Sequence, residues 1–139
     1  MSQPRYLLDA GPLTALLQGR AGAVTLIRPW IQNREAATSI LAYGEAVEYL
    51  RPKPDYPAHL DALHQLLAGV RPFFLTYPIL RRYADLRLHL RPRGQLIGDV
   101  DTLIAATALE RHLTVVTLDG DFARIPGLAV LHLTKQQLR

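Results

Sequence analysis

The feature that most constrains the fold of this chain is a regular alternation of short apolar segments with longer helical segments. The apolar segments have the length and composition of strands buried in a parallel sheet. Strands that alternate with helices are typical of an α/β fold, in which helices cover both faces of a mainly parallel sheet. With 139 residues, we expect one three-layer domain over residues 1–139. The expected strands cover residues 5–8, 36–40, 73–77, 113–117 and 129–133, and the expected helices cover residues 12–17, 23–33, 41–51, 59–69, 78–91 and 99–112.

Composition excludes several classes of site and location. The chain has no cysteine, which excludes disulfides, thiolate zinc sites and cysteine nucleophiles and is compatible with a reducing cytoplasm. No apolar run reaches the roughly 18 residues of a membrane helix, and the N-terminus has no signal-peptide pattern. We therefore expect a cytoplasmic protein without a membrane. The net charge of +4, mostly from arginine, is only a weak indication of a nucleic-acid partner, and ordinary surface arginines explain it equally well.

Two acids stand at the start of the most apolar helix. Asp99 and Asp101 precede Leu103-Ile104-Ala105-Ala106, and a helix with so few polar positions is expected to be buried. A single N-cap accounts for one acid, and we assign that role to Asp99. Asp101 then lies in the first turn, on the stripe that continues through Ala105 and Ala108. It is expected to point toward the interior.

Three more acids occupy comparable positions. Asp9 follows the first strand and Asp119 follows the fourth, and ligands of open α/β sheets bind beyond such strand ends. Helix capping and a turn at Asp119-Gly120 are the structural alternatives for these two. Glu45 lies in the helix after the second strand, close to its apolar stripe, and is expected to point inward. Glu48 is interpreted as facing solvent.

These acids are expected to converge at one edge of the sheet. Several carboxylates packed together cannot all ionise without a compensating cation. A set of oxygen ligands without histidine or thiolate favours Mg²⁺ or Mn²⁺. Such a centre can activate water and stabilise the leaving oxygen of a phosphodiester. Glycine motifs for nucleotide binding are absent from the sequence.

Four motifs, taken together, resemble the PIN-domain family, and more narrowly the VapC-like toxin ribonucleases of type II toxin–antitoxin systems. They are Leu7-Leu8-Asp9-Ala10-Gly11-Pro12-Leu13, Ser39-Ile40-Leu41-Ala42-Tyr43-Gly44-Glu45, Ile97-Gly98-Asp99-Val100-Asp101 with the apolar run to Ala106, and Val116-Thr117-Leu118-Asp119-Gly120-Asp121-Phe122. The resemblance covers essentially the whole chain, in order and with suitable intervals.

The resemblance implies a single PIN-like domain with Mg²⁺- or Mn²⁺-dependent endoribonuclease activity. It implies Asp9, Glu45, Asp101 and Asp119 as catalytic and metal-binding acids. Thr117 matches a supporting hydroxyl, and Asp99 and Asp121 are alternative ligands. The chain departs from the family at Gly11, where the family commonly has Asn or Ser, so a polar side chain that helps to hold the acids or a water is missing.

The resemblance also implies an RNA substrate, a small antitoxin partner and a homodimer. Apolar helices near Trp30 and residues 60–67 are candidates for an interface, although the intramolecular core explains most of these residues. Two other functions stay open at this stage. The first is a non-catalytic PIN-like module that binds RNA or a protein, and the second is a PIN nuclease that processes RNA outside toxin–antitoxin systems.

Overall fold

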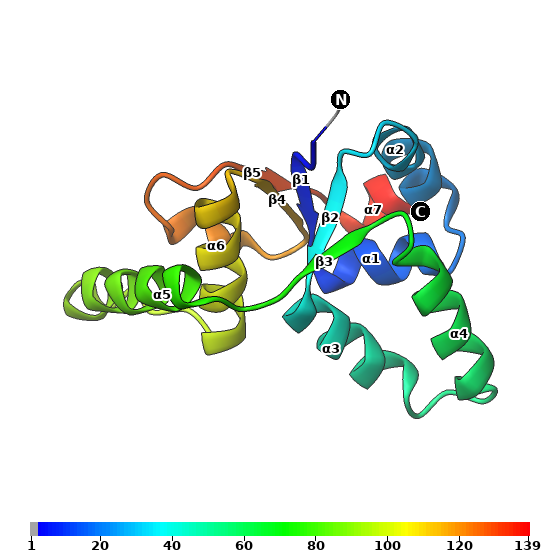
Figure 1. Ribbon diagram of the computed structural model, residues 1–139, viewed down its shortest axis with the longest axis horizontal. Helices are drawn as coiled ribbons and strands as arrows, with labels where there is room; N and C mark the ends of the chain where they lie inside the picture. The colour runs from blue at the N-terminus through cyan, green and yellow to red at the C-terminus, as the bar shows by residue number, and fades with distance from the viewer. Residues whose placement is uncertain (1–2) are drawn as a thin grey trace.

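The computed structural model describes residues 3–139 and confirms the α/β architecture. Its five-stranded sheet has the order β3-β2-β1-β4-β5, and every neighbouring pair is parallel (Figure 1). The strands are β1 (Tyr6–Leu8), β2 (Ala36–Ser39), β3 (Arg71–Phe73), β4 (Thr114–Thr117) and β5 (Val130–His132).

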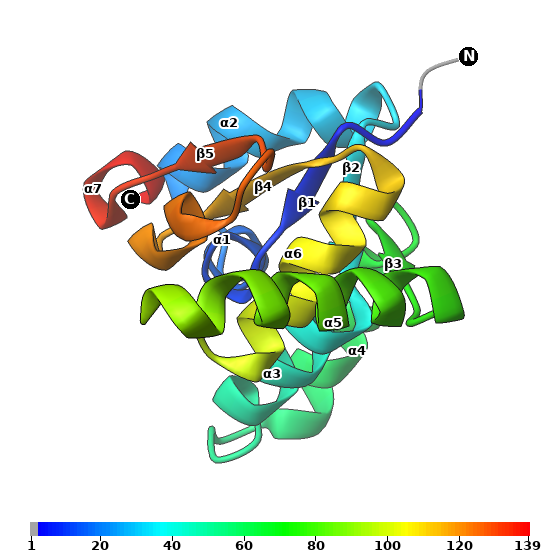
Figure 2. The ribbon, with the colours of Figure 1, turned by 90° about the vertical axis from the view of Figure 1, so that its left-hand side faces the viewer.

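Helices cover both faces of this sheet. One layer holds α5 and α6, which lie in front of the strands in Figure 2, and the other holds α1, α2, α4 and α7, while α3 lies across the edge. The helices are α1 (Ala10–Leu17), α2 (Ala21–Gln32), α3 (Ile40–Leu50), α4 (Tyr56–Leu66), α5 (Tyr77–Leu90), α6 (Asp99–Arg111) and α7 (Lys135–Leu138). Among the helices of residues 3–139, none combines the length and the apolar character that a membrane crossing requires.

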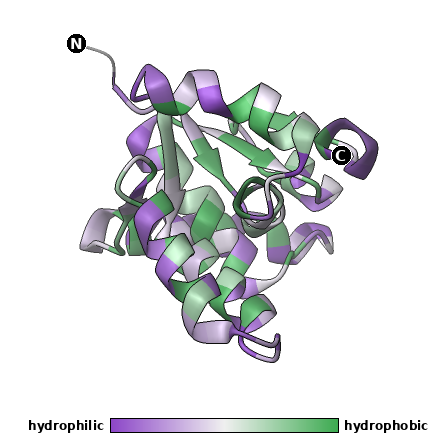
Figure 3. Cartoon of the chain, turned by 90° about the vertical axis from the view of Figure 1, so that its right-hand side faces the viewer, coloured by the Kyte–Doolittle hydropathy of each residue, from purple (hydrophilic) through white to green (hydrophobic). Residues whose placement is uncertain are grey.

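The hydrophobic core has two parts because successive strand residues point to opposite faces of the sheet. Leu7 and Val115 belong to the core under α5 and α6, whereas Leu8 and Val116 belong to the core under α1, α2 and α4. The strands carry green, hydrophobic stretches in the hydropathy colouring of Figure 3. Trp30 stacks on Tyr6 with ring centroids 4.0 Å apart, so it packs within the chain.

The strand order defines where a ligand can enter. The chain passes from β1 to β2 and β3 on one side of the sheet, then crosses to β4 and β5 on the other side. This reversal creates a topological switch point beside β1, and ligands of open α/β sheets bind outside the carboxyl ends of the strands there. Asp9 follows β1, and Asp119 follows β4.

Two elements differ from the sequence-based expectation. The third strand covers Arg71–Phe73 rather than residues 73–77, because Thr76 caps α5 with its side chain and Phe74 is 64% exposed. Helix α7 was not expected, because its four residues are too few to show an apolar period. The capping box of Thr134 and Gln137 was the available signal for its start.

Candidate metal centre

Asp9 is held at the junction of β1 and α1. Its backbone amide donates to the carbonyl of Val116 in β4, at 2.9 Å. The residue is only 9% exposed and occupies the N-cap position of α1, yet within residues 3–139 its side chain makes no capping hydrogen bond. Helix capping therefore does not account for this buried acid.

Thr117 joins two of the predicted acids. Its hydroxyl donates to Asp9 Oδ2 at 2.7 Å and accepts the backbone amide of Asp119 at 3.0 Å. The side chain is fully buried at the end of β4. The supporting role expected for Thr117 thus takes the form of a hydrogen bond that orients the carboxylate of Asp9.

Asp9, Glu45 and Asp101 meet at the switch point. One carboxylate oxygen from each lies within 4.8 Å of the other two. Asp101 comes from the first turn of α6, and Ala105 and Ala108 continue its stripe into the core, as expected. Three acids from distant parts of the chain therefore form one cluster.

Glu45 differs from expectation in its exposure. It was expected to point inward among apolar neighbours, but it is an exposed residue at the rim of the cluster. The reason is that α3 packs on the core through Ala42, Ala46 and Leu50. Glu45 reaches Asp9 from the solvent side, and Glu48 is also exposed, as expected.

Asp119 stands beside the cluster of three. Its Oδ1 accepts the backbone amide of Asp121 at 2.8 Å and so caps the short 3-10 helix η2 (Gly120–Arg124). The turn expected at Asp119-Gly120 is therefore present, and one carboxylate oxygen of Asp119 takes part in it. Asp119 nevertheless lies near enough to Asp101 to raise its pKa by its charge and by a hydrogen bond.

The electrostatics of the cluster oppose ionisation. Burial raises the pKa of Asp9, the Thr117 hydroxyl and the Ala10 amide lower it, and Asp119 raises it again. Partial desolvation of its carboxyl group and the charges of Asp9 and Glu48 raise the pKa of Glu45. Burial and the surrounding acids Asp9, Asp119 and Glu45 raise the pKa of Asp101 to about 7. A cation in the cluster would relieve this repulsion.

Asp99 and Asp121, the two alternative metal ligands expected from the sequence, interact with residues outside the cluster. Asp99 is the first residue of α6 and not its N-cap, which is Gly98, so the expected capping role of Asp99 is wrong. Its carboxylate turns toward α5 instead, where Arg87 and the hydroxyl of Tyr83 donate to it. Asp121 lies 3.5 Å from the guanidinium of Arg124. Neither belongs to the group of three carboxylates.

The donor set fits a hard divalent cation. The three convergent groups are all carboxylates, and their oxygens lie close together in a partly buried cluster. Oxygen ligands of this kind favour Mg²⁺ or Mn²⁺ over metals that prefer nitrogen or sulfur. A bound ion of this type can polarise a phosphoryl oxygen and lower the pKa of water.

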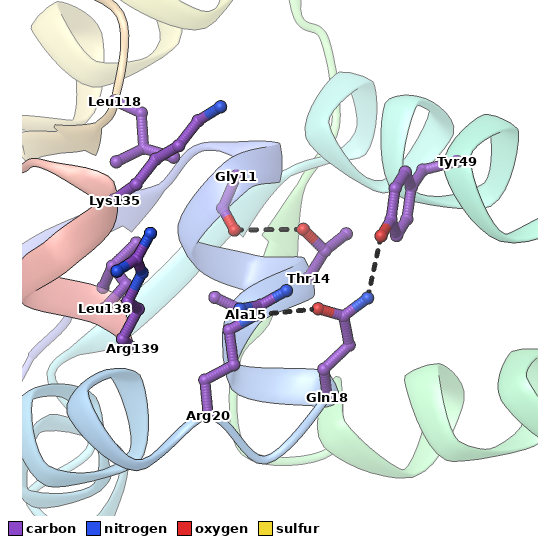
Figure 4. Close-up of a pocket in the computed structure, with 10 residues that line it drawn as sticks. All are labelled: Gly11, Thr14, Ala15, Gln18, Arg20, Tyr49, Leu118, Lys135, Leu138 and Arg139. Atoms are coloured by element: carbon purple, nitrogen blue, oxygen red, sulfur yellow. Dashed lines mark hydrogen bonds between the residues drawn. The ribbon is translucent and has the colours of Figure 1, made fainter.

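Gly11 lies in close contact with Leu118. A Cβ atom at this position would lie 2.9 Å from Leu118 Cδ1. A larger residue at position 11 would therefore displace the end of the Leu118 side chain. Gly11 and Leu118 also line a pocket whose basic residues in α7, Lys135 and the adjoining Arg139, were missed from the sequence (Figure 4).

Comparison with known proteins places this geometry in context. The sequence model of the PIN domain matches residues 6–128. The curated protein Ribonuclease VapC5 of Mycobacterium tuberculosis is 40% identical over 55 residues, which are 40% of this chain and 41% of that protein. The matched part thus spans about two-fifths of the length of this relative.

Solved structures share the fold over nearly the whole chain. The structure of VapBC2 from Rickettsia felis bound to a DNA fragment from the promoter superposes with a TM-score of 0.82 at 21% identity, covering 92% of this chain and 98% of the other. DNA-bound VapBC from Salmonella typhimurium superposes with a TM-score of 0.83 at 18% identity, and the match covers 93% of this chain and 98% of the other. VapBC-5 from Mycobacterium tuberculosis superposes with a TM-score of 0.62 at 26% identity, and the match covers 94% of this chain and 99% of the other.

Proposed function

This chain belongs to the PIN domain family, and on that premise we propose that it is a metal-dependent endoribonuclease that acts as the toxin of a toxin–antitoxin pair. The observation that carries the proposal is the convergence of Asp9, Glu45 and Asp101 within 4.8 Å at the switch point of the sheet. The name of the relative Ribonuclease VapC5 supports an RNA substrate. The similar VapBC-5 structure is described as a member of a family of toxin–antitoxin systems, which supports the biological role.

In the proposed centre, Asp9, Glu45 and Asp101 would hold Mg²⁺ or Mn²⁺, and Asp119 would orient water or contribute to a second ion. When bound, the ion supplies a Lewis acid for the phosphodiester and an activated water. Thr117 fixes the direction of the Asp9 carboxylate through its hydrogen bond of 2.7 Å. Burial and the neighbouring acids raise the pKa of Asp101 to about 7, so a cation bound at this carboxylate would compete with a proton near neutral pH.

The proposed partners are a small antitoxin and a second copy of this chain. Large apolar side chains remain exposed in and around α5, and they support an interface on that surface better than Trp30 or Leu63, which pack within the chain. These exposed residues include Phe74 at 64%, Tyr77 at 82%, Leu80 at 42% and Leu88 at 65%.

Substitution of the central acids tests the proposed reaction. Purified wild-type protein is incubated with RNA in Mg²⁺, in Mn²⁺ and in EDTA, and cleavage is followed on gels. We expect cleavage with either ion, none in EDTA, and none from folded Asp9→Asn or Asp101→Asn. Asp61→Asn changes an exposed acid of α4 and serves as the matched control that retains activity.

Retained cleavage by folded, contaminant-free Asp9→Asn would contradict the proposed centre. If wild-type protein binds RNA without cutting it under both metal conditions, the non-catalytic RNA-binding role takes its place. The toxin role is tested separately by expressing the chain alone and together with the product of any small reading frame that adjoins its gene. Growth arrest that this product relieves is the expected result.

A further inference from the structure

A pocket of about 340 Å³ lies beside the candidate metal centre, between α1, α3 and α7 (Figure 4). Two of its lining residues belong to the segments that carry the acids, because Gly11 comes two residues after Asp9 and Leu118 directly precedes Asp119. Two Cα–Cα steps span at most about 8 Å. The segments that line the pocket therefore adjoin those that carry the acids, and Tyr49 of the pocket lies one helical turn after Glu45 on α3.

The pocket has the opposite charge to the cluster. The side chains of Arg20, Lys135 and Arg139 line it, and the described residues that line it include no Asp or Glu. Within residues 3–139, none of the three forms a salt bridge. Three cations around one cavity repel one another, so an anion in the cavity is favoured. We name this cavity the basic pocket.

Arg20 is held in place by a chain of hydrogen bonds. Its Nε donates to Gln18 Oε1 at 3.1 Å, and Gln18 Nε2 donates to the hydroxyl of Tyr49 at 2.9 Å. Figure 4 shows this chain of hydrogen bonds running from the connection between α1 and α2 to Tyr49 on α3, along one wall of the pocket. Among the described residues, only Nε of this guanidinium has a hydrogen-bond partner, so its two terminal nitrogens can bind a ligand in the fork geometry that suits a phosphate.

The opposite wall is held by a close backbone contact. The amide of Gly22 in α2 donates to the backbone oxygen of Arg139 at 2.6 Å. A Cβ atom at position 22 would lie 2.3 Å from the carbonyl oxygen of Gln137, so only glycine permits this approach. The contact fixes α7 against α2, and it thereby positions Lys135 and Arg139 at the pocket.

We propose that the basic pocket binds a phosphate of the RNA strand that flanks the phosphodiester cleaved at the acidic cluster. The inference rests on the proposed function, which supplies RNA as the polyanion. A cavity of about 340 Å³ has the size of a small-ligand site and takes a single nucleotide unit. A strand that lies across Gly11 and Leu118 presents one phosphate to the acids and a neighbouring phosphate to Arg20, Lys135 and Arg139.

Salt dependence of RNA binding tests this assignment. All proteins carry Asp101→Asn, so that RNA is bound and not cut, and the probe is a short fluorescein-labelled single-stranded RNA of randomised sequence. Affinity is measured by fluorescence anisotropy over a series of salt concentrations. Arg20→Gln and Lys135→Gln are compared with Arg28→Gln, which neutralises an exposed arginine of α2 outside the pocket lining.

We expect Arg20→Gln and Lys135→Gln each to weaken RNA binding about tenfold at low salt. Each should also lower the slope of log K against log salt by about 0.7, the value for one lost phosphate contact on a single strand. Arg28→Gln should keep the original slope. Slopes for the pocket variants equal to that of Arg28→Gln would overturn the inference. Impaired binding of poly-glutamate with unchanged RNA binding would also overturn it, because an acidic protein segment would then be the occupant.

The binding test fails or succeeds independently of the nuclease proposal. If the protein without Asp101→Asn cleaves RNA while the pocket variants bind like the control, the pocket assignment is wrong and the nuclease stands. If that protein does not cleave RNA while the pocket variants lower the slope, the nuclease proposal is wrong and the phosphate site stands.

Discussion

The hydroxyl of Thr117 donates a hydrogen bond of 2.7 Å to Asp9 Oδ2, joining two residues 108 positions apart in the chain. The bond links the carboxyl ends of β1 and β4, the two strands that flank the switch point. It also gives a buried carboxylate the donor that its burial requires. One side chain therefore contributes both to the stability of the fold and to the orientation of an acid in the candidate centre.

Replacing Thr117 by Val should separate these contributions. Val keeps the shape of the side chain but leaves Asp9 without its hydroxyl donor, so we expect a loss of about 1–3 kcal/mol in the free energy of unfolding. We expect RNA cleavage to fall about tenfold or more, because the carboxylate loses its fixed orientation. Urea unfolding and initial cleavage rates measure the two effects. Thr117→Ser retains the hydroxyl and should restore most of both, and a Ser variant as impaired as the Val variant would contradict this account.

The raised pKa of Asp101 predicts a pH-dependent stability for the metal-free protein. The folded state holds the proton up to a pKa of about 7, whereas the ordinary value is 3.8. Stability from this group is thus fully present below about pH 4 and is lost as pH rises toward 7. The substitution Asp101→Asn removes the group that causes this loss of stability. We therefore expect the free energy of unfolding of Asp101→Asn to exceed that of wild type by more at pH 8 than at pH 5, by about 1 kcal/mol after allowance for solvent screening. Thermal unfolding in EDTA at both values provides the measurement, and an advantage independent of pH would be inconsistent with the cluster.

Divalent cations should stabilise the folded protein. A ligand that binds only the folded state at 100 times its dissociation constant adds about 2.7 kcal/mol. We expect Mn²⁺ and Mg²⁺ to raise the melting temperature, and the rise to shrink below pH 7 because protons compete for Asp101. Asp9→Asn should abolish the shift while Asp61→Asn keeps it. A shift that survives in Asp9→Asn would place the binding site elsewhere.

Asp99 and Asp101 should respond differently to the same substitution. The carboxylate of Asp99 is 68% exposed and pairs with Arg87, so its removal should cost less than about 1 kcal/mol of stability. We expect Asp99→Asn to cleave RNA within about twofold of wild type, because the acid lies outside the group of three. RNA cleavage assays on Asp99→Asn and Asp101→Asn show which of the two acids the reaction requires. Loss of activity in folded Asp99→Asn with activity retained in Asp101→Asn would reverse the assignment.

Two glycine substitutions test the contact between α2 and α7. In Gly22→Ala the new Cβ would lie 2.3 Å from the Gln137 carbonyl oxygen, so the backbones must separate, and we expect a loss of about 1–3 kcal/mol. Gly44→Ala is the control, because in the described part of the chain nothing lies within 4 Å of its Cβ position. It should gain about 0.5–1 kcal/mol from the lower flexibility of Ala in a helix. Urea unfolding measures both, and equal effects would refute the close contact.

Much of the architecture could be predicted from local patterns. The apolar runs at Leu7-Leu8 and Val115-Val116 required strands buried on both faces, and the structure places them in β1 and β4. The third strand was misplaced because the apolar residues Phe74 and Leu75 suggested burial, yet they lie in an exposed connection before α5. Apolar composition indicates a preference for burial, and only the whole packing decides which apolar residues obtain it.

Some features of the candidate site could also be predicted from the sequence, whereas others depend on the packing of the chain. The stripe of Asp101, Ala105 and Ala108 follows from helical periodicity alone, so the choice of Asp101 over Asp99 could be made from the sequence. The exposure of Glu45 could not, because it depends on how α3 lies across the edge of the sheet. The partner of Asp99 could not be predicted from the sequence either. Arg87 belongs to a different helix, α5, and only the packing of α5 on α6 brings the two residues together.

The sequence by itself determined the alternation of strands and helices, the strand-end positions of Asp9 and Asp119, and the inward stripe of Asp101, because each depends on short-range periodicity and backbone chemistry. The tertiary structure decided which acids converge within 4.8 Å, which acid pairs with an arginine, and where α7 places Lys135 in the lining of the basic pocket. Those relationships depend on distances between residues remote in the chain, which are set by strand order and by contacts such as that of Gly22 with α7.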